Sequence, residues 1–270
     1  MVTMKGTAPA RKLTKRECYA KQGIQFDGKH ILSPLGWINE LLKQGNVKLG
    51  KTVYTFSLLP GKAEYSAVIS GEYIVAVGTC CCVCDGCYAM TGHYRQASAR
   101  RSMIINTTLV NLYLDFVRRA ITAQLEWIGK GECRIHAAGD FNTKNPEEYA
   151  AMWHDIVTRF PNIRFWTYTK VKRFETLFDD VKNANVVKSI VPGMGKNYGH
   201  CDYIMTLYYG LREMGKKVYI CKCGIDKGQY CENCNVCAAY DYVLFLEHGT
   251  GYKPEKDPSF GKFCELVKNQ

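Results

Sequence analysis

The sequence lacks a long apolar run, since no stretch approaches the 18 uninterrupted apolar residues that a membrane-spanning helix needs. Residues 1–12 also lack the apolar segment of a secretory signal peptide. We therefore expect a soluble, cytoplasmic protein that has no membrane partner.

Two catalytic motifs are also missing. Zinc nucleobase deaminases need a His-x-Glu upstream of a Cys-x2-Cys pair, and the sequence contains no His-x-Glu. It contains no Gly-x-Ser-x-Gly nucleophile elbow either. Gly45 to Thr52 does match the phosphate-loop pattern Gly-x4-Gly-Lys-Ser/Thr, but that loop follows a strand and opens a helix. Here the reverse order is expected, so we predict a helix C-cap at Gly45 and a turn before a strand at Val53.

The composition is that of a well-cored globular protein, because 47% of the 270 residues are hydrophobic and 12% are aromatic. The formal net charge of +11 favours an anionic partner, either a small molecule or a nucleic acid. Solvated basic faces that only confer solubility would give the same charge. The basic residues gather in an N-terminal arm, after residue 94 and in two later clusters: Lys5, Arg11, Lys12, Lys15, Arg16, Arg95, Arg100, Arg101, Arg118, Arg119, Lys170, Lys172 and Arg173.

Fourteen cysteines are present, which in a reducing compartment favours metal binding over disulfides. Five of them lie within residues 80–87, and adjacent cysteines cannot pair with one another without severe distortion. Cys80, Cys84 and Cys87 have the spacing to hold three irons of a [4Fe-4S] cluster, as would Cys81 with the same two partners. A zinc site built from Cys-x2-Cys pairs is the alternative.

A second group predicts a further metal site near the C-terminus. Cys231, Cys234 and Cys237 form a Cys-x2-Cys-x2-Cys motif, and Cys221 upstream completes a set of four for zinc or a second cluster. One cysteine of this group could instead supply the fourth ligand of the first cluster.

Strands and helices are expected to alternate along the chain, which is typical of a parallel α/β sheet or barrel. The predicted helices are 33–45, 97–128 as one or two joined helices, one opened by Asn145-Pro146, and 202–214. The predicted strands are 53–59, 65–77 with a turn at Ser70-Gly71, 134–138, 163–169, 186–191, 217–220 and 242–246, and the barrel strands begin near Tyr73, Arg134, Ile163, Val186, Lys217 and Tyr242.

We expect two parts: residues 1–60 as a basic N-terminal arm with a helical extension, and residues 61–270 as a barrel-like iron–sulfur domain. The second part carries a cysteine-rich insertion at about 221–240. Chemistry in such folds collects at the carboxyl ends of the strands.

Several polar residues fall at those strand ends. Asp140 follows a predicted strand and either binds a ligand or caps local amides. His136 is either an acid/base or a hydrogen-bonded core residue. Lys170 ends an aromatic strand and could point into a pocket, and Ser189 ends the next strand.

The cysteine spacing resembles that of the radical S-adenosylmethionine (SAM) superfamily, although Gly86 stands where that superfamily usually has an aromatic residue. Residues 80–89, 134–141 and 165–170, followed by the second cysteine group, resemble more specifically the phage-encoded gene-product-88 family. We expect this match to cover about 80–250 and residues 1–60 to have no counterpart.

The resemblance implies a partial or complete parallel (βα) barrel of the radical-SAM type. It implies a [4Fe-4S] cluster, SAM as a further cofactor held by Gly139, Asp140 and Ser189, and catalytic roles for Asp140, Lys170 and His136. The expected function is a redox or radical-SAM-like enzyme with an electron donor and an unidentified substrate, in the host cytoplasm if a phage encodes it. The alternative is a basic nucleic-acid-binding protein stabilised by structural zinc or iron–sulfur sites.

Overall fold

The structure is a computed structural model that describes residues 11–45, 49–80, 88–90, 92–188, 200–222, 234, 236–245 and 253–269. The α-helices are α1 (Lys15–Lys21), α2 (Ala97–Leu112), α3 (Leu114–Ile128), α4 (Pro146–Arg159), α5 (Cys201–Glu213) and α6 (Phe260–Lys268). The strands are β1 (His30–Ser33), β2 (Gly36–Asn39), β3 (Lys43–Gln44), β4 (Val53–Thr55), β5 (Glu64–Ile69), β6 (Glu72–Val77), β7 (Gly131–Ile135), β8 (Ile163–Thr169), β9 (Ala184–Lys188), β10 (Val218–Ile220) and β11 (Tyr242–Leu244).

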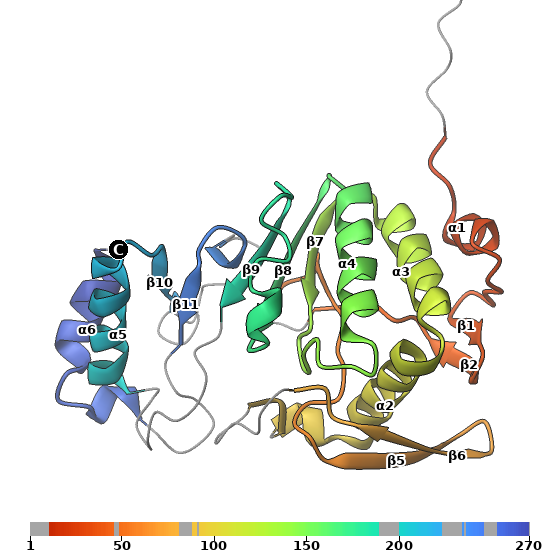
Figure 1. Ribbon diagram of the computed structural model, residues 1–270, viewed down its shortest axis with the longest axis horizontal. Coiled ribbons are helices and arrows are strands. Elements are labelled where there is room, and N and C mark those ends of the chain that lie inside the picture. Colours follow the sequence, from red (N-terminus) through yellow and green to blue (C-terminus); the bar gives the residue numbers. More distant parts are fainter. Residues whose placement is uncertain are drawn as a thin grey trace, which may run out of the picture.

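The central sheet has the strand order β3-β4-β7-β8-β9. Strands β4, β7, β8 and β9 are parallel, and β3 pairs antiparallel with β4 at one edge. A second parallel sheet, β10-β11, lies beyond β9, and the amide of Lys188 donates to the carbonyl of Asp241 just before β11 (2.9 Å; Figure 1). The mixed α/β architecture therefore agrees with the predicted alternation. The described strands do not close into a barrel, and closure stays a prediction.

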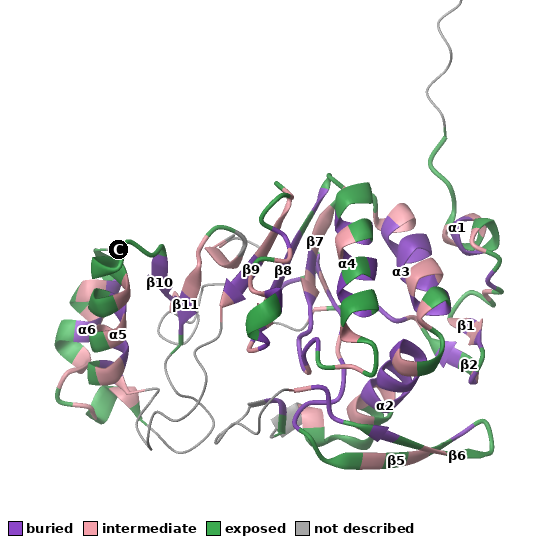
Figure 2. Ribbon diagram, in the orientation of Figure 1, coloured by how far each residue is buried: buried purple, intermediate pink, exposed green. Residues whose placement is uncertain are grey.

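The two faces of the central sheet pack against different partners because alternate strand residues point to opposite sides. Cys133, Ile135 and Phe165 belong to the main core, which also contains buried residues of α3 and α4 (Figure 2). Val53 and Trp166 lie on the opposite face in a small cluster with Leu49, Tyr168 and Cys237. The turn Val236–Ala238, which carries Cys237, therefore lies against the face of the sheet opposite to α3 and α4.

The predicted helix over 33–45 is wrong. Residues 30–39 form the antiparallel hairpin β1-β2, in which Ser33 Oγ donates to the carbonyl of Gly36 (2.8 Å) and accepts from the amide of Leu35 (3.1 Å). Gly36 has a φ of +88°, which glycine adopts without strain. Ser33 and Pro34 therefore open a tight turn rather than a helix.

The phosphate-loop pattern begins at Gly45, directly after β3, and β4 begins directly after its last residue, Thr52. Lys43–Gln44 pairs antiparallel with β4, and the amide of Gly45 donates to the carbonyl of Val53 (2.6 Å). The predicted turn before Val53 is confirmed, whereas the predicted helix C-cap at Gly45 is wrong because a strand precedes it.

The predicted hairpin over 65–77 is confirmed as β5-β6, with Ser70 (φ 51°) and Gly71 (φ 88°) in its turn. It is a separate antiparallel sheet that contacts α2 (Figure 1). The prediction that a parallel strand begins near Tyr73 is therefore wrong, and the first parallel strand of the central sheet is β4.

Most other elements are confirmed with small shifts in their bounds. The long helical segment is two helices, α2 and α3, joined at Tyr113, and Pro146 opens α4. Helix α6 and hairpin β1-β2 were not predicted. No helix among the residues that the structure describes is long and apolar enough to cross a membrane.

The described residues do not separate at residue 60. Tyr19, Leu41 and Phe56 belong to the same buried core as α3 and α4, and β4 pairs with β7. Residues 201–267 contribute a second, smaller core between α5, α6 and β10-β11.

Candidate functional site

The first cysteine group begins at the carboxyl end of β7. Thr79 Oγ1 accepts a hydrogen bond from the amide of Asp140 (3.0 Å), and the amide of Asn142 donates to the carbonyl of Thr79 (3.1 Å). The amide of Cys80 donates to the carbonyl of Gly61 (3.0 Å). Cys80 is thereby fixed beside the loop that follows β7.

Asp140 is a buried carboxylate whose oxygens are both hydrogen-bonded. Its Oδ1 accepts from the amide of Phe141 (2.8 Å) and from Thr169 Oγ1 (2.7 Å), and its Oδ2 accepts from the amide of Lys170 (2.9 Å). Burial raises the pKa of Asp140, while these donors oppose that rise. The interpretation that Asp140 caps local amides is confirmed, and the carboxylate ties the end of β8 to the end of β7.

Gly139 allows the close packing of these loops. It has a φ of +80°, and a Cβ atom there would lie 2.7 Å from both Leu58 Cβ and Thr79 Oγ1. Only glycine fits this position without a shift of its neighbours.

His136 lies in the core rather than in an open site. It is 2% exposed, its Nε2 lies 2.7 Å from the hydroxyl of Tyr149, and its Nδ1 lies 3.4 Å from Thr167 Oγ1. Burial, helped by the charge of Arg134, lowers the pKa of His136 to about 3. These contacts fit the hydrogen-bonded core residue, and an acid/base role stays a prediction.

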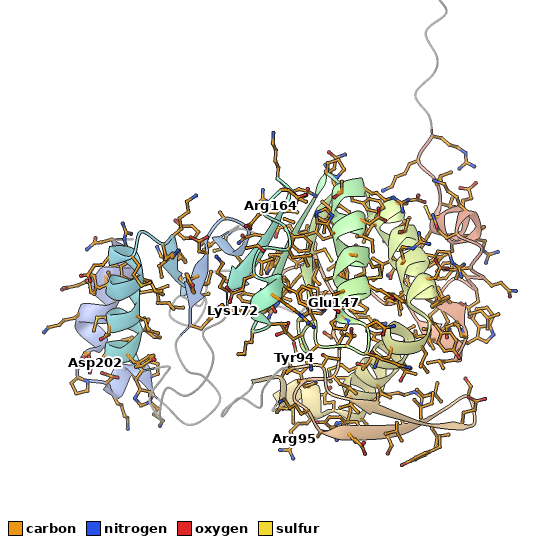
Figure 3. The ribbon with its side chains drawn as sticks, in the orientation of Figure 1. Tyr94, Arg95, Glu147, Arg164, Lys172 and Asp202 are labelled. Carbon is orange, nitrogen blue, oxygen red and sulfur yellow. The ribbon has the colours of Figure 1, made fainter. Side chains whose placement is uncertain are left out.

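Three basic residues, Lys170, Lys172 and Arg173, directly follow β8 at the carboxyl end of the sheet. Figure 3 shows Arg164 at the start of β8 and Lys172 and Glu147 at the other end of the sheet. Lys170 is half-buried there, and Lys172 is exposed. The guanidinium of Arg173 lies 2.9 Å from the carboxylate of Glu147.

Cys237 of the second group lies on the face of the sheet opposite to α3 and α4, in a 3-10 turn (Val236–Ala238) that contacts β8 and β9. The hydroxyl of Tyr168 lies 2.7 Å from Cys237 Sγ. Asn185 Nδ2 donates to the carbonyls of Cys237 (2.8 Å) and Tyr240 (2.9 Å). The guanidinium of Arg134 lies 4.8 Å from the centre of the Tyr168 ring.

A second predicted ligand, Cys221, lies at the end of β10. Its amide donates to the carbonyl of Leu244 (2.7 Å). Burial raises the pKa of Tyr168, and Cys237 and then Cys221 add to that rise. The structure therefore places one predicted metal ligand, Cys237, in contact with Tyr168.

Accessibility separates the predicted ligands from three other cysteines. Cys80, Cys221, Cys234 and Cys237 are partly exposed, whereas Cys18, Cys133 and Cys201 are buried. Cysteine sulfur is a common ligand of zinc and of iron–sulfur clusters, so these accessible thiols are suited to metal binding. Three further predicted ligands, Cys84, Cys87 and Cys231, lie outside the described residues, as does Ser189.

A complete metal site cannot be assembled from the described part of the chain. There, no three His, Cys, Asp or Glu residues are arranged to hold one metal ion. The ligand sets for a [4Fe-4S] cluster, a second cluster or zinc therefore stay predictions, as does the binding of SAM.

The sequence analysis missed the residues that hold this site together. Thr79 and Thr169 bind Asp140 and its loop, and Asn185 holds the turn that carries Cys237. One signal was available, because Thr79 directly precedes the cysteine group. Asn185 had a weaker signal, since its side chain is a polar amide within a strand.

These features define an α/β protein whose parallel sheet has Cys80 near its carboxyl end and Cys237 on the face opposite to α3 and α4. A family model described as gene product 88 matches residues 40–191, more than half of the chain. The chain belongs to this family of phage gene products. No curated protein and no solved structure matches it.

The resemblance to the gene-product-88 family is therefore confirmed, although its span differs from the expected one. The match begins at residue 40, so it includes β3 and β4, and it ends before the second cysteine group.

Proposed function

We propose that the protein is an iron–sulfur protein in which Cys80, Cys84 and Cys87 bind a [4Fe-4S] cluster at the carboxyl end of the parallel sheet. The observation that carries this proposal is the contact between Thr79 and Asp140, which fixes the first cysteine at the end of β7. The carboxyl ends of parallel strands are the usual place of chemistry in α/β folds.

The proposed activity is that of a redox or radical-SAM-like enzyme in a partial barrel. A cluster held by three thiolates has one iron open to an exchangeable ligand and supplies one-electron chemistry there. Lys170 contributes a half-buried cation beside this site, suited to an anionic ligand group. Asp140 holds the backbone of Lys170 in place.

The second cysteine group is proposed to bind zinc or another cluster through Cys221, Cys231, Cys234 and Cys237. Its support is the partial exposure of Cys221, Cys234 and Cys237 and the contact between Cys237 and the hydroxyl of Tyr168. An electron donor is the partner that a redox role would require.

The decisive experiment is anaerobic purification with analysis of iron, sulfide and zinc. We expect brown protein with broad absorption near ~400 nm from thiolate-bound iron. Cys84→Ala should abolish this absorption if no other thiol replaces the ligand, whereas Cys264→Ala, a partly exposed thiol outside both groups, should retain it. Colourless protein with stoichiometric zinc would refute the cluster.

A separate experiment tests the SAM-dependent activity. Reduced protein incubated with SAM should release 5′-deoxyadenosine, and Cys84→Ala should not. If the cluster is reduced but SAM stays intact, the radical-SAM proposal is refuted. The proposed role is then electron transfer.

A second proposed function is nucleic-acid binding with structural metal sites. The net charge of +11 and the exposed cations at the carboxyl end of the sheet favour it, including Lys172 and Arg95. Binding should weaken steeply with salt because phosphate contacts release counterions. Failure to bind DNA or RNA at low salt would remove this function.

A further inference from the structure

A groove lies between α1 and the hairpin β1-β2, away from both cysteine groups. Its volume is about 470 Å³. It is lined by Arg16, Ala20, Ile24, Gln25, Phe26 and Trp37, together with the backbone at Gly23. The lining thus combines two aromatic rings, one guanidinium and one amide.

Trp37 is held at this groove by the register of the hairpin. Its neighbour Ile38 pairs with Ile31, and both are buried in the main core. Successive strand residues point to opposite faces, so Trp37 points away from that core and is 50% exposed. An indole ring so exposed has an apolar face open to a ligand.

The second ring is fixed from the other side. Phe26 packs against the buried ring of Tyr19, with 5.0 Å between the ring centres. The ammonium of Lys15 lies 5.7 Å from the centre of the Phe26 ring and also binds Glu40 (2.7 Å). The wall formed by Phe26 is therefore preorganised.

Arg16 is the cation that this groove can offer to a ligand. Three neighbouring cations, Arg11, Lys15 and Lys21, form ion pairs with Glu17, Glu40 and Glu126. Within the described ranges, Arg16 forms no ion pair, and its side chain is exposed. Lys12 and Lys29 are further exposed cations on the segments that flank the groove.

We propose that this groove binds single-stranded nucleic acid, with a base stacked on Trp37 and a phosphate bound by Arg16. The inference rests on the second proposed function and names its site. An aromatic face beside an unpaired cation is the arrangement by which proteins bind single strands without reading their sequence. The charge of Arg16 and the net charge of +11 favour a phosphate-bearing ligand over an uncharged peptide.

The test uses the full chain and the fluorescence of its tryptophans. Trp153 is 0% exposed, Trp166 is 3% exposed and Trp127 is partly buried, so a base that stacks in the groove should mainly quench Trp37. We expect oligothymidylate and oligouridylate to quench the emission in a saturable, salt-dependent manner. Trp37→Phe should remove most of this quenching.

Affinity is measured by fluorescence anisotropy of labelled oligothymidylate. Trp37→Ala should weaken binding by about 5-fold to about 140-fold, the usual loss for one stacked base. Arg16→Gln should reduce the slope of log affinity against log salt by about 0.7, the value for one phosphate contact on a single strand. Lys21→Gln is the matched control, because it removes the same charge from α1 outside the groove.

The possible results distinguish binding in this groove from nucleic-acid binding elsewhere on the protein. If the wild type binds oligothymidylate and Trp37→Ala binds equally well, the groove is refuted while nucleic-acid binding stands. If the wild type does not bind at low salt, both are refuted. Quenching of Trp37 by a proline-rich peptide but not by an oligonucleotide would also overturn the proposal. Circular dichroism of all four variants verifies that they are folded.

Discussion

The hydroxyl of Thr79 accepts a hydrogen bond from the amide of Asp140, 61 residues later in the chain. The same hydroxyl donates to the carbonyl of Leu59 (3.0 Å). One buried side chain thus joins three segments: the end of the β4 segment, the start of the first cysteine group and the loop after β7. The position of Cys80 depends on this junction.

Thr79→Val should lower the free energy of unfolding by about 1–3 kcal/mol, because it leaves the buried amide of Asp140 without its acceptor. Urea unfolding measures this loss. Thr122→Val is the matched control, since among the described residues the buried hydroxyl of Thr122 has no hydrogen-bond partner. That control should be neutral or stabilising, and equal losses in both variants would contradict the role of Thr79.

Gly139→Ala should be more destabilising than Gly129→Ala. Both positions have positive φ angles, +80° and +74°, so both variants have backbone strain. Only at position 139 would the new methyl group meet other atoms, Leu58 Cβ and Thr79 Oγ1, at 2.7 Å. The difference should be about 1–3 kcal/mol, the usual cost of overpacking. Thermal and urea unfolding of both variants test it, and equal costs would exclude the close contact.

His136 should make stability depend on pH below about 6.5. The buried imidazole has its pKa lowered to about 3, so between these values the unfolded chain binds a proton that the folded chain does not. This contribution is fully present above pH 6.5 and is lost as the pH falls, by about 1.4 kcal/mol per pH unit.

The measurement compares the wild type with His136→Gln at several pH values. Between pH 7 and pH 5 the wild type should lose about 2 kcal/mol more than the variant. His154→Gln, on the exposed side of α4, should retain the wild-type slope because His136 is intact. Parallel pH profiles for the wild type and His136→Gln would show that folding does not shift the pKa of His136 and would contradict the prediction.

Asn185→Asp should loosen the turn that carries Cys237. The amide nitrogen donates to two carbonyls of that segment, and a carboxylate oxygen in its place would face both as a second acceptor. Hydrogen exchange should therefore become faster in residues 236–240.

Asn183→Asp is the matched control on the same strand segment. Its Nδ2 donates to the carbonyls of Val157, Phe160 and Ile163, so the substitution should affect the end of α4 and the start of β8. If Asn183→Asp increases hydrogen exchange in residues 236–240 as much as Asn185→Asp does, the specific role of Asn185 in holding that turn is refuted.

The sequence predicted those parts of the fold whose signals are local. The bounds of β8 match the prediction over residues 163–169, Pro146 opens α4, and Ser70-Gly71 turns the hairpin β5-β6. In each case the deciding residues lie within the element or directly beside it.

The segment over residues 33–45 shows why other predictions failed. Ser33-Pro34 is a valid helix start in isolation, but the backbone at Leu42, just before β3, is bound by the side chain of Gln124, which accepts from its amide (2.8 Å) and donates to its carbonyl (3.1 Å). These partners are 82 residues apart. A pattern read within one window does not contain such a partner.

In the candidate site, too, the sequence predicted the residues with local signals but not the contacts between distant elements. The strand ends identified Asp140 and Lys170, and the structure brings them together. The direction of His136 into the core depends on Tyr149 of α4, and the position of Cys237 depends on Tyr168 and Asn185. These contacts join elements whose spatial order the sequence pattern does not define.

The pairing of β4 with β7 has a consequence for the order of events during synthesis. Strand β4 leaves the ribosome before the hairpin β5-β6 and the helices α2 and α3, yet its parallel partner follows all of them. Pairing β4 with β7 closes a long loop, which costs conformational entropy, so this pair of strands forms late. One edge of the nascent β4 therefore stays unpaired until β7 has emerged. By then the cysteines of residues 80–87 have already left the ribosome.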